Sequence, residues 1–471
     1  MKPDRISSLA VIIAFATAAL ALSSSSSDAC TNILVTKGAS ADGSTMITYA
    51  CDGRFHPRLN HSAPADHDPD AEYEIRHWSG ELVGVIPQVS RTHGVVGLMN
   101  EHQLAISETT TTGREELQNP DGLIHYWTLM KLTLERAATA REAIEVMTGL
   151  VEEHGYRSTA ESFSIADPNE VWLMEMIGTG PGGEGAVWVA MKIPDGSIAA
   201  YANGIRIRRF PLDDPENCLY SDNVISFAVD RGYWDPASGE PFSFADAYDV
   251  PTQQSRRYTA TRVWSIFRRA APSLELDPAY HRGDPSAEPY PLWIEPENKL
   301  SLADVIALMR DHYEGTDYDM TKGVDAGPYA TPNRWRPMSW TVDGDEYTWE
   351  RPISTQQTGF SFISQSRSWL PDAVGGVYWY GLDDTSTSVY VPLYAGISRI
   401  PESFTVGSLE KFSWGSGWWV FYFVADIAIR EYWVMVGGIR GVLGGRGGRF
   451  VSVRAVSGAS AVGVAESEAV R

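Results

Sequence analysis

The chain reads Cys30-Thr31-Asn32-Ile33-Leu34-Val35-Thr36-Lys37-Gly38-Ala39-Ser40-Ala41-Asp42-Gly43-Ser44 directly after an apolar leader. Its run of β-branched and apolar residues predicts a strand over 31–36. Asp42-Gly43 is a strong hairpin signal, so residues 45–51 are predicted to be the returning strand. The stretch therefore predicts an antiparallel hairpin that opens on a cysteine.

The leader, residues 1–29, has the three zones of a secretory signal peptide. Lys2 and Arg5 give a basic start, an apolar run covers 9–22, and small polar residues end at Ala29. The apolar run is shorter than the about 20 residues that a membrane span needs. We therefore expect cleavage after Ala29, a secreted or periplasmic protein, and no stable membrane insertion afterwards. An uncleaved anchor is the alternative.

Cleavage after Ala29 would make Cys30 the first residue of the mature chain. A cysteine thiol, with a pKa of about 8.5, needs a base to become a good nucleophile. The free α-amine has a pKa of about 7.7–8.0, so an N-terminal cysteine carries its own base. The alternative is a buried or incidental cysteine that happens to follow the cut.

The composition is that of a folded protein, and it narrows the range of partners. The 471 residues include 43% hydrophobic and 21% charged side chains, as is usual in globular proteins. Acidic residues outnumber basic ones, 60 to 38, and the formal net charge is -22. This balance argues against binding to nucleic acid or to anionic lipid, because both need a cationic surface.

Three cysteines are too few for a disulfide framework, so the fold must depend on its core. We expect Cys51 and Cys218 to be free thiols, although an exported protein could join them in one disulfide. A loop rich in His and Asp over 54–72 lacks a zinc-binding spacing such as HExxH, and we interpret it as solvated. No metal and no cofactor are therefore expected.

Periodicity and turn signals predict an α+β fold. Hairpin-length connections favour antiparallel sheets covered by helices. Residues 437–471, rich in Gly, Val and Arg, are expected to be a flexible tail to a domain over 30–436. Strands are expected over 94–100, 104–110, 161–166, 170–176, 186–193 and 197–202, and helices over 122–155, 256–269 and 301–313, the last capped by Ser301.

Several separate phrases, in a fixed order, resemble those of one family. They are 30–40 with Asp42-Gly43-Ser44, Asn100-Glu101-His102-Gln103-Leu104-Ala105-Ile106-Ser107-Glu108, Ala199-Ala200-Tyr201-Ala202-Asn203, Arg351-Pro352-Ile353-Ser354-Thr355, Ser361-Phe362-Ile363-Ser364-Gln365, Trp369-Leu370-Pro371 and Trp379-Tyr380-Gly381-Leu382-Asp383-Asp384. Together they resemble the secreted dipeptidases related to dipeptidase A, which are N-terminal nucleophile cysteine hydrolases. The resemblance implies an αββα sandwich of antiparallel sheets with insertions, and hydrolysis of dipeptides with a free amino end.

The resemblance also implies roles for single residues. Cys30 is expected to be the nucleophile, with its α-amine as the base. Asp52 is expected to hold that amine, and Asn203 to form part of the oxyanion hole. Arg262 is expected to lie near the nucleophile. On the residues alone, Asp52 and Asn203 each precede a glycine and fit a turn, while Arg262 fits an exposed helix charge, so these alternatives stay open.

Two further positions are expected to bind substrate. Glu108 stands where the family has a residue near the oxyanion hole. Tyr49 stands where the distantly related penicillin V acylases and bile-salt hydrolases have an arginine, so substrates that depend on that arginine are not expected here.

The sequence therefore predicts an exported cysteine dipeptidase that acts through a thioester on Cys30. One alternative is an amidase or acylase for non-peptide linear amides, of the penicillin V acylase type. Another is a Trp-rich extracytoplasmic binding protein without turnover. The sequence leaves open which dipeptides are preferred and whether the protein forms a homo-oligomer.

Overall fold

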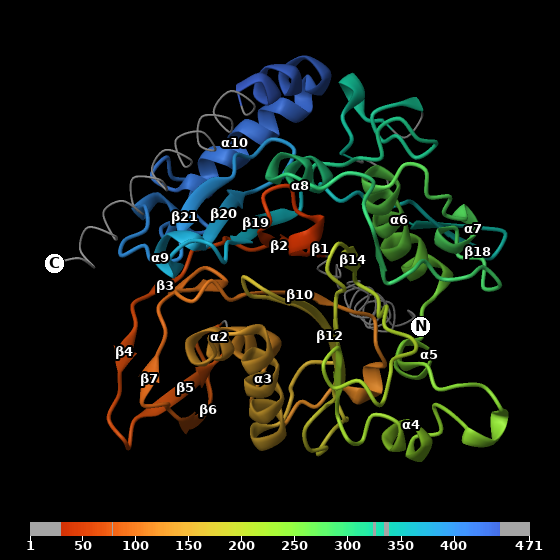
Figure 1. The fold of residues 1–471 in the computed structure, drawn as a ribbon. Helices are drawn as coiled ribbons and strands as arrows, with labels where there is room; N and C mark the ends of the chain where they lie inside the picture. Colours follow the sequence, from red (N-terminus) through yellow and green to blue (C-terminus); the bar gives the residue numbers. More distant parts are fainter. Residues whose placement is uncertain (1–29, 78, 324–325, 334–338, 443–471) are drawn as a thin grey trace, which may run out of the picture.

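The computed structural model describes residues 30–77, 79–323, 326–333 and 339–442. The expected signal peptide and the expected tail from residue 443 onward lie outside these residues. Two large antiparallel sheets form the centre of the described chain (Figure 1). They meet face to face, with β10 (Ala105–Thr110) of one sheet against β1 (Thr31–Val35) and β2 (Thr45–Asp52) of the other.

The first sheet has seven strands and is built around the predicted hairpin. β1 pairs with β2 in the register Thr31↔Ala50 and Leu34↔Ile47, which confirms the hairpin. The short 3-10 helix η1 (Lys37–Ala39) begins the connection between them. The other strands are β14 (Ile198–Ala202) and then β16 (Trp293–Ile294) beside β1, and β19 (Thr358–Ser366), β20 (Val377–Leu382) and β21 (Val391–Tyr394) beyond β2.

The second sheet has eight strands and contains most of the other predicted ones. The strand expected over 94–100 is divided in two, because Gly97, with a φ of 58°, allows a tight turn in its middle. In sheet order the strands are β15 (Cys218–Tyr220), β13 (Val187–Lys192), β12 (Val171–Ile177), β11 (Ala160–Ala166), β10, β9 (Met99–Asn100), β8 (Val95–Val96) and β3 (His61–Ser62).

Helices cover the outer face of each sheet (Figure 1). The helical stretch predicted over 122–155 forms α2 (Tyr126–Arg136) and α3 (Ala140–His154), which pack on the second sheet. α6 (Gln253–Ala270) packs on β14 of the first sheet, and α8 (Leu302–Met309) and α10 (Gly417–Arg430) lie on the same side. The described chain therefore has the expected α+β fold of antiparallel sheets, in four layers.

Smaller elements surround these layers. Residues 432–442 are helical, so helical structure continues into the first residues of the expected tail. Within the described ranges, no helix combines the length and the apolar character that crossing a bilayer requires. The smaller elements include the strand pairs β4 (Ala65–Asp66) with β7 (Arg91–Thr92), β5 (Glu72–Arg76) with β6 (Leu82–Pro87) and β17 (Ser339–Val342) with β18 (Asp345–Thr348), and the short helices α4 (Ser226–Asp230), α5 (Phe244–Tyr248), α7 (Pro278–His281) and α9 (Asp372–Gly375).

The side chains along β1 alternate between two cores, as the period of a strand requires. Ile33 and Val35 belong to the core that contains Val263 and Phe267 of α6. Cys30 belongs instead to the core between the two sheets. The alternation thus directs the cysteine away from α6 and into the space between the sheets.

The N-terminus of α8 offers a test of the predicted helix cap. Ser301 and Asp304 form a capping box, in which each side chain binds the backbone N–H of the other residue. Ser301→Ala should lower the free energy of unfolding by about 0.5–2 kcal/mol. Urea unfolding measures this change, with the exposed Ser90→Ala as the control. Equal stability of the two variants would contradict the prediction.

Candidate active site

Cys30 directly precedes β1 and is almost fully buried, with 3% of its surface exposed. Its carbonyl oxygen accepts a hydrogen bond from Arg262 Nη1 (2.7 Å), and the same nitrogen donates to Thr31 Oγ1 (2.9 Å). Arg262 lies 232 positions further along the chain, in the middle of α6. A distant helix therefore fixes the backbone at the cysteine.

Arg262 also connects Cys30 to Asn203. Its Nη2 donates to Asn203 Oδ1 (2.8 Å), and Asn203 Nδ2 donates to the carbonyl oxygen of Thr110 at the end of β10 (2.8 Å). The Arg262 side chain is completely buried, and this burial lowers its pKa to about 10, which leaves it charged at neutral pH. The structure thus places Arg262 inside the site and not among the exposed charges of α6.

Asp52 ends β2 and is buried. Arg351 Nη2 lies 3.4 Å from Asp52 Oδ2, and Thr358 Oγ1 donates to Asp52 Oδ1 (2.6 Å). Burial raises the pKa of Asp52 to about 6, although the Arg351 charge and the Thr358 hydrogen bond act in the opposite direction. Asp52 is therefore a carboxyl group that is partly protonated in mildly acidic solution.

A line of hydrogen bonds joins the Cys30 thiol to the second sheet. Cys30 Sγ donates to Tyr49 Oη (3.7 Å), and the Tyr49 hydroxyl donates to Glu108 Oε1. Glu161, on the neighbouring strand β11, is buried as well. Its pKa is raised well above the ordinary value by burial, by the Glu108 charge and by a hydrogen bond to Glu108. These surroundings therefore favour the protonated form of Glu161.

Cys51 lies beside Cys30, which is its cross-strand neighbour in the register of β1 and β2. A hydrogen bond between the two thiols is the main cause that raises the pKa of Cys30, followed by burial and by the nearby charges of Glu108 and Asp52. Cys30, Cys51 and Cys218 are all free thiols, as expected for the last two. While the peptide bond before Cys30 is intact, the raised pKa keeps the Cys30 thiol protonated at neutral pH unless another group acts as a base.

The structure brings Cys30 and the other five expected site residues together and adds residues that were not expected. Arg351 opens one of the family phrases, so the resemblance contained a signal for it. The observed register of β1 and β2, centred between Ser40 and Ala41, brings Cys51 opposite Cys30, whereas Asp42-Gly43 as a two-residue turn would not. Thr358 and Glu161 carry no local signal, because only the pairing of distant strands brings them near. The six expected residues are Cys30, Tyr49, Asp52, Glu108, Asn203 and Arg262.

Such a site, a buried cysteine among a guanidinium, an amide and carboxyl groups, is typical of an enzyme that transfers acyl groups through sulfur. Comparison with known proteins identifies the family of the chain. The pattern of Peptidase family C69 matches residues 29–78 and 77–442. The chain belongs to this family, which confirms the resemblance seen in the sequence.

Similar proteins come from several bacteria. A probable dipeptidase of Latilactobacillus sakei is 28% identical over 423 residues, which are 86% of this chain and 82% of that protein. A probable dipeptidase of Salmonella dublin is 30% identical over 389 residues, 78% of this chain and 81% of that protein. A dipeptidase of Bifidobacterium longum is 26% identical over 434 residues, 82% of this chain and 76% of that protein.

The raised pKa of Asp52 predicts a pH dependence of stability. Between about pH 4 and pH 6 the folded chain keeps the Asp52 proton that the unfolded chain has lost, so the contribution of Asp52 to stability falls as the pH rises through this window. The fall is at most about 3 kcal/mol. The Asp52→Asn variant has no carboxyl group at this position, so it should not show this loss of stability.

Urea unfolding of wild type and Asp52→Asn from pH 4 to pH 7 measures the difference, with the exposed Asp66→Asn as the control. These measurements should use protein in which the peptide bond before Cys30 is still intact. A free α-ammonium group on Cys30 would lower the pKa of Asp52 again. Parallel pH profiles of wild type and Asp52→Asn would refute the assignment.

Proposed function

We propose that the protein is an exported dipeptidase in which cleavage after Ala29 exposes Cys30 as an N-terminal nucleophile. The observation that carries this proposal is the position of Cys30 at the start of a central strand, with its carbonyl held by Arg262 and with Asn203 on the same guanidinium. The names of the similar dipeptidases support the reaction. The four-layer arrangement supports the αββα sandwich of N-terminal nucleophile hydrolases.

The base would be the α-amine of Cys30. The surroundings of the thiol raise its pKa through the Cys51 hydrogen bond, burial and negative charge, so a nucleophile at this position needs a proton acceptor within reach. Removal of the leader supplies a neutral amine on the same residue. We propose that the Asp52 carboxylate orients this amine, because its charge already acts on Cys30 and it is itself held by Arg351.

The reaction would proceed in two acyl transfers. The α-amine accepts the thiol proton while sulfur attacks the carbonyl carbon of the peptide bond. The resulting α-ammonium group then protonates the departing amino group as the C–N bond breaks, which leaves a thioester on Cys30. Water, deprotonated by the same amine, attacks the thioester, and the thiol recovers its proton as the carboxylic acid product leaves.

The oxyanion of each tetrahedral intermediate needs fixed donors. Asn203 Nδ2 is the proposed side-chain donor, because Arg262 already fixes the orientation of this amide by binding its oxygen. A hydrogen bond from Arg262 to the amide oxygen also polarises the amide and strengthens its N–H groups as donors. Arg262 would thus act through Asn203 and through the Cys30 backbone.

The proposed substrate-binding residues are Glu108 and Tyr49. Both lie on the thiol side of the space between the sheets, and the Tyr49 hydroxyl joins Cys30 to Glu108. A substrate with a free ammonium end would bring a positive charge toward a site whose nearest charges include Glu108 and Asp52. This complementarity favours dipeptides over amides that lack a free amino end.

Replacement of the nucleophile tests the mechanism. Cys30→Ala should abolish hydrolysis of dipeptides, whereas Cys218→Ala should keep the wild-type rate, because Cys218 lies in β15 at the edge of the second sheet. Intact-mass analysis of the active protein should find Cys30 as its first residue. Active protein that begins upstream of Cys30 would disprove an N-terminal nucleophile. A panel of dipeptides and acylated amines separates a dipeptidase from an acylase.

The oxyanion role of Asn203 has its own signature. Asn203→Ala should lower kcat by about 10²–10³ with a small change in KM, because the lost donor acts mainly in the transition state. Steady-state kinetics measures both constants, and the exposed Asn223→Ala is the control. An effect on KM alone, or a loss of activity explained fully by unfolding, would contradict this role.

A further inference from the structure

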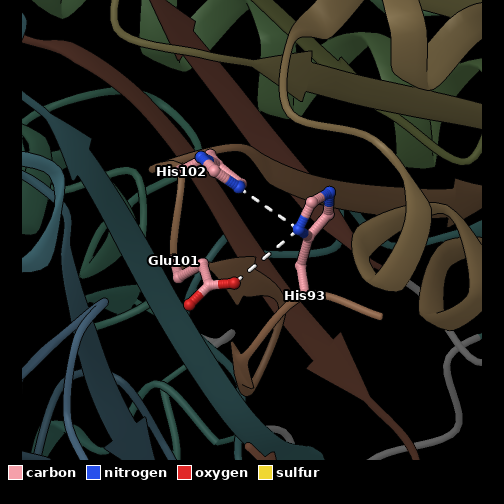
Figure 2. Close-up of side chains that lie close together, drawn as sticks. All are labelled: His93, Glu101 and His102. Carbon is pink, nitrogen blue, oxygen red and sulfur yellow. Dashed lines mark hydrogen bonds and ion pairs between the residues drawn. The ribbon is translucent and has the colours of Figure 1, made fainter. Parts of the chain in front are cut away.

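A second group of side chains, of the types that bind metal ions, lies near β10. It adjoins the end of this strand that is opposite to the site around Cys30. His93, Glu101 and His102 point toward one another (Figure 2), and one ligand atom from each lies within 4.8 Å of the other two. They adjoin the Ala105 end of β10, whereas Glu108 and Thr110 at its far end contact the site around Cys30. The group therefore has no part in the proposed reaction.

The fold explains why these three residues meet. β8 and β9 form a hairpin with the register Val95↔Asn100, so the residues just before β8 oppose those just after β9. The N–H of Glu101 donates to the carbonyl of Gly94 (2.8 Å), and the N–H of Gly94 donates to Glu101 Oε1 (3.2 Å). His93 and the Glu101-His102 pair thus face each other across the open end of a hairpin.

The distances suit a small tetrahedral cation. His102 Nε2 lies 3.2 Å from His93 Nδ1, and His93 Nδ1 lies 3.7 Å from Glu101 Oε1. Zinc bonds of about 2.0–2.1 Å to nitrogen and oxygen place tetrahedral ligands about 3.3 Å apart. Two imidazoles and one carboxylate are also a common zinc donor set that leaves a fourth position for water.

The surroundings hold the proposed ligands in place. Asp372 Oδ2 lies 3.9 Å from His102 Nδ1, the ring nitrogen that does not face the cluster, and Gln103 Nε2 donates to Asp372 Oδ1 (2.8 Å). A carboxylate behind a ligating histidine is the usual support of a metal site. Asp372 begins the short helix α9, so the support comes from a segment far away in sequence.

The carbonyl end of α2 also favours a cation here. The N–H of His93 donates to the Glu135 carbonyl (2.8 Å), and Asn100 Nδ2 donates to the carbonyls of Leu134 and Ala137 (2.9 and 2.7 Å). These bonds fix both sides of the hairpin opening against the last turn of α2. The C-terminus of a helix carries partial negative charge, which is favourable to a nearby positive ion.

We propose that His93, Glu101 and His102 form a zinc-binding site that joins the ends of the β8–β9 hairpin. The spacing of the three residues matches no zinc motif, which is why no metal was expected from the sequence. The site is partly exposed, with 21% of the His93 side chain and 36% of the His102 side chain accessible, so an ion can enter from solvent.

Zinc titration of the chelator-treated protein tests this site directly. Calorimetry with zinc chloride should find one ion per chain in wild type. His93→Gln and His102→Gln should lose this binding, and Asp372→Asn should weaken it by about 10–100-fold. His67→Gln is the matched control, because His67 is also a partly buried histidine and its ring binds the Thr92 hydroxyl at the end of β7. The melting temperature should rise with zinc in wild type and His67→Gln and should stay unchanged in His93→Gln and His102→Gln.

X-ray absorption at the zinc edge of the wild-type protein gives a measurement that needs no variant. The expected first shell contains nitrogen and oxygen at about 2.0–2.2 Å with imidazole scattering. Sulfur at about 2.3 Å would place zinc on thiols such as Cys30 and Cys51 and would overturn the proposal. Binding that survives unchanged in folded His93→Gln and His102→Gln would overturn it as well, as would the absence of stoichiometric binding to wild type.

Discussion

The charged group of Arg262, buried without access to water, is the constraint on which the site depends. A buried guanidinium is tolerated only when acceptors surround it, and its donors here bind the carbonyl of Cys30, the hydroxyl of Thr31 and the amide oxygen of Asn203. These acceptors come from the start of β1 and the end of β14. One side chain of α6 therefore fixes both neighbouring strand ends, and the cysteine and the asparagine keep a single relative position.

Both sheets contribute side chains to the site around Cys30. The first sheet contributes Cys30, Tyr49 and Asp52, and the second contributes Glu108 and Glu161. The charge of Glu108 disfavours ionisation of Glu161, and the charges of Glu108 and Asp52 disfavour ionisation of the Cys30 thiol. Negative charge beside the thiol also favours a nearby positive group, which the proposed function supplies as the α-ammonium group of a processed Cys30 or the amino end of a substrate.

Local signals predicted the parts of the fold that depend on neighbouring residues. The Asp-Gly signal predicted the β1–β2 hairpin, although not its register, and Ser301 marked the start of α8 as its capping box requires. The strand expected over 94–100 was divided because one glycine with positive φ turned the chain back on itself. The resemblance to a family supplied most of the expected site residues, including Arg262, which local pattern alone would have assigned to an exposed helix face.

The sequence by itself determined the hairpin that follows Cys30, the antiparallel α+β organisation and the family. Turns, strand periodicity and ordered motifs depend on residues that are close together in the sequence, so they can be identified without the structure. Only the tertiary structure decided which charges face the thiol. Cys51 meets Cys30 across a pair of strands, Arg351 reaches Asp52 from 299 positions away, and His93 meets His102 across a hairpin opening. Such contacts depend on register and on packing between layers, and these follow from the balance of the whole core rather than from any local stretch.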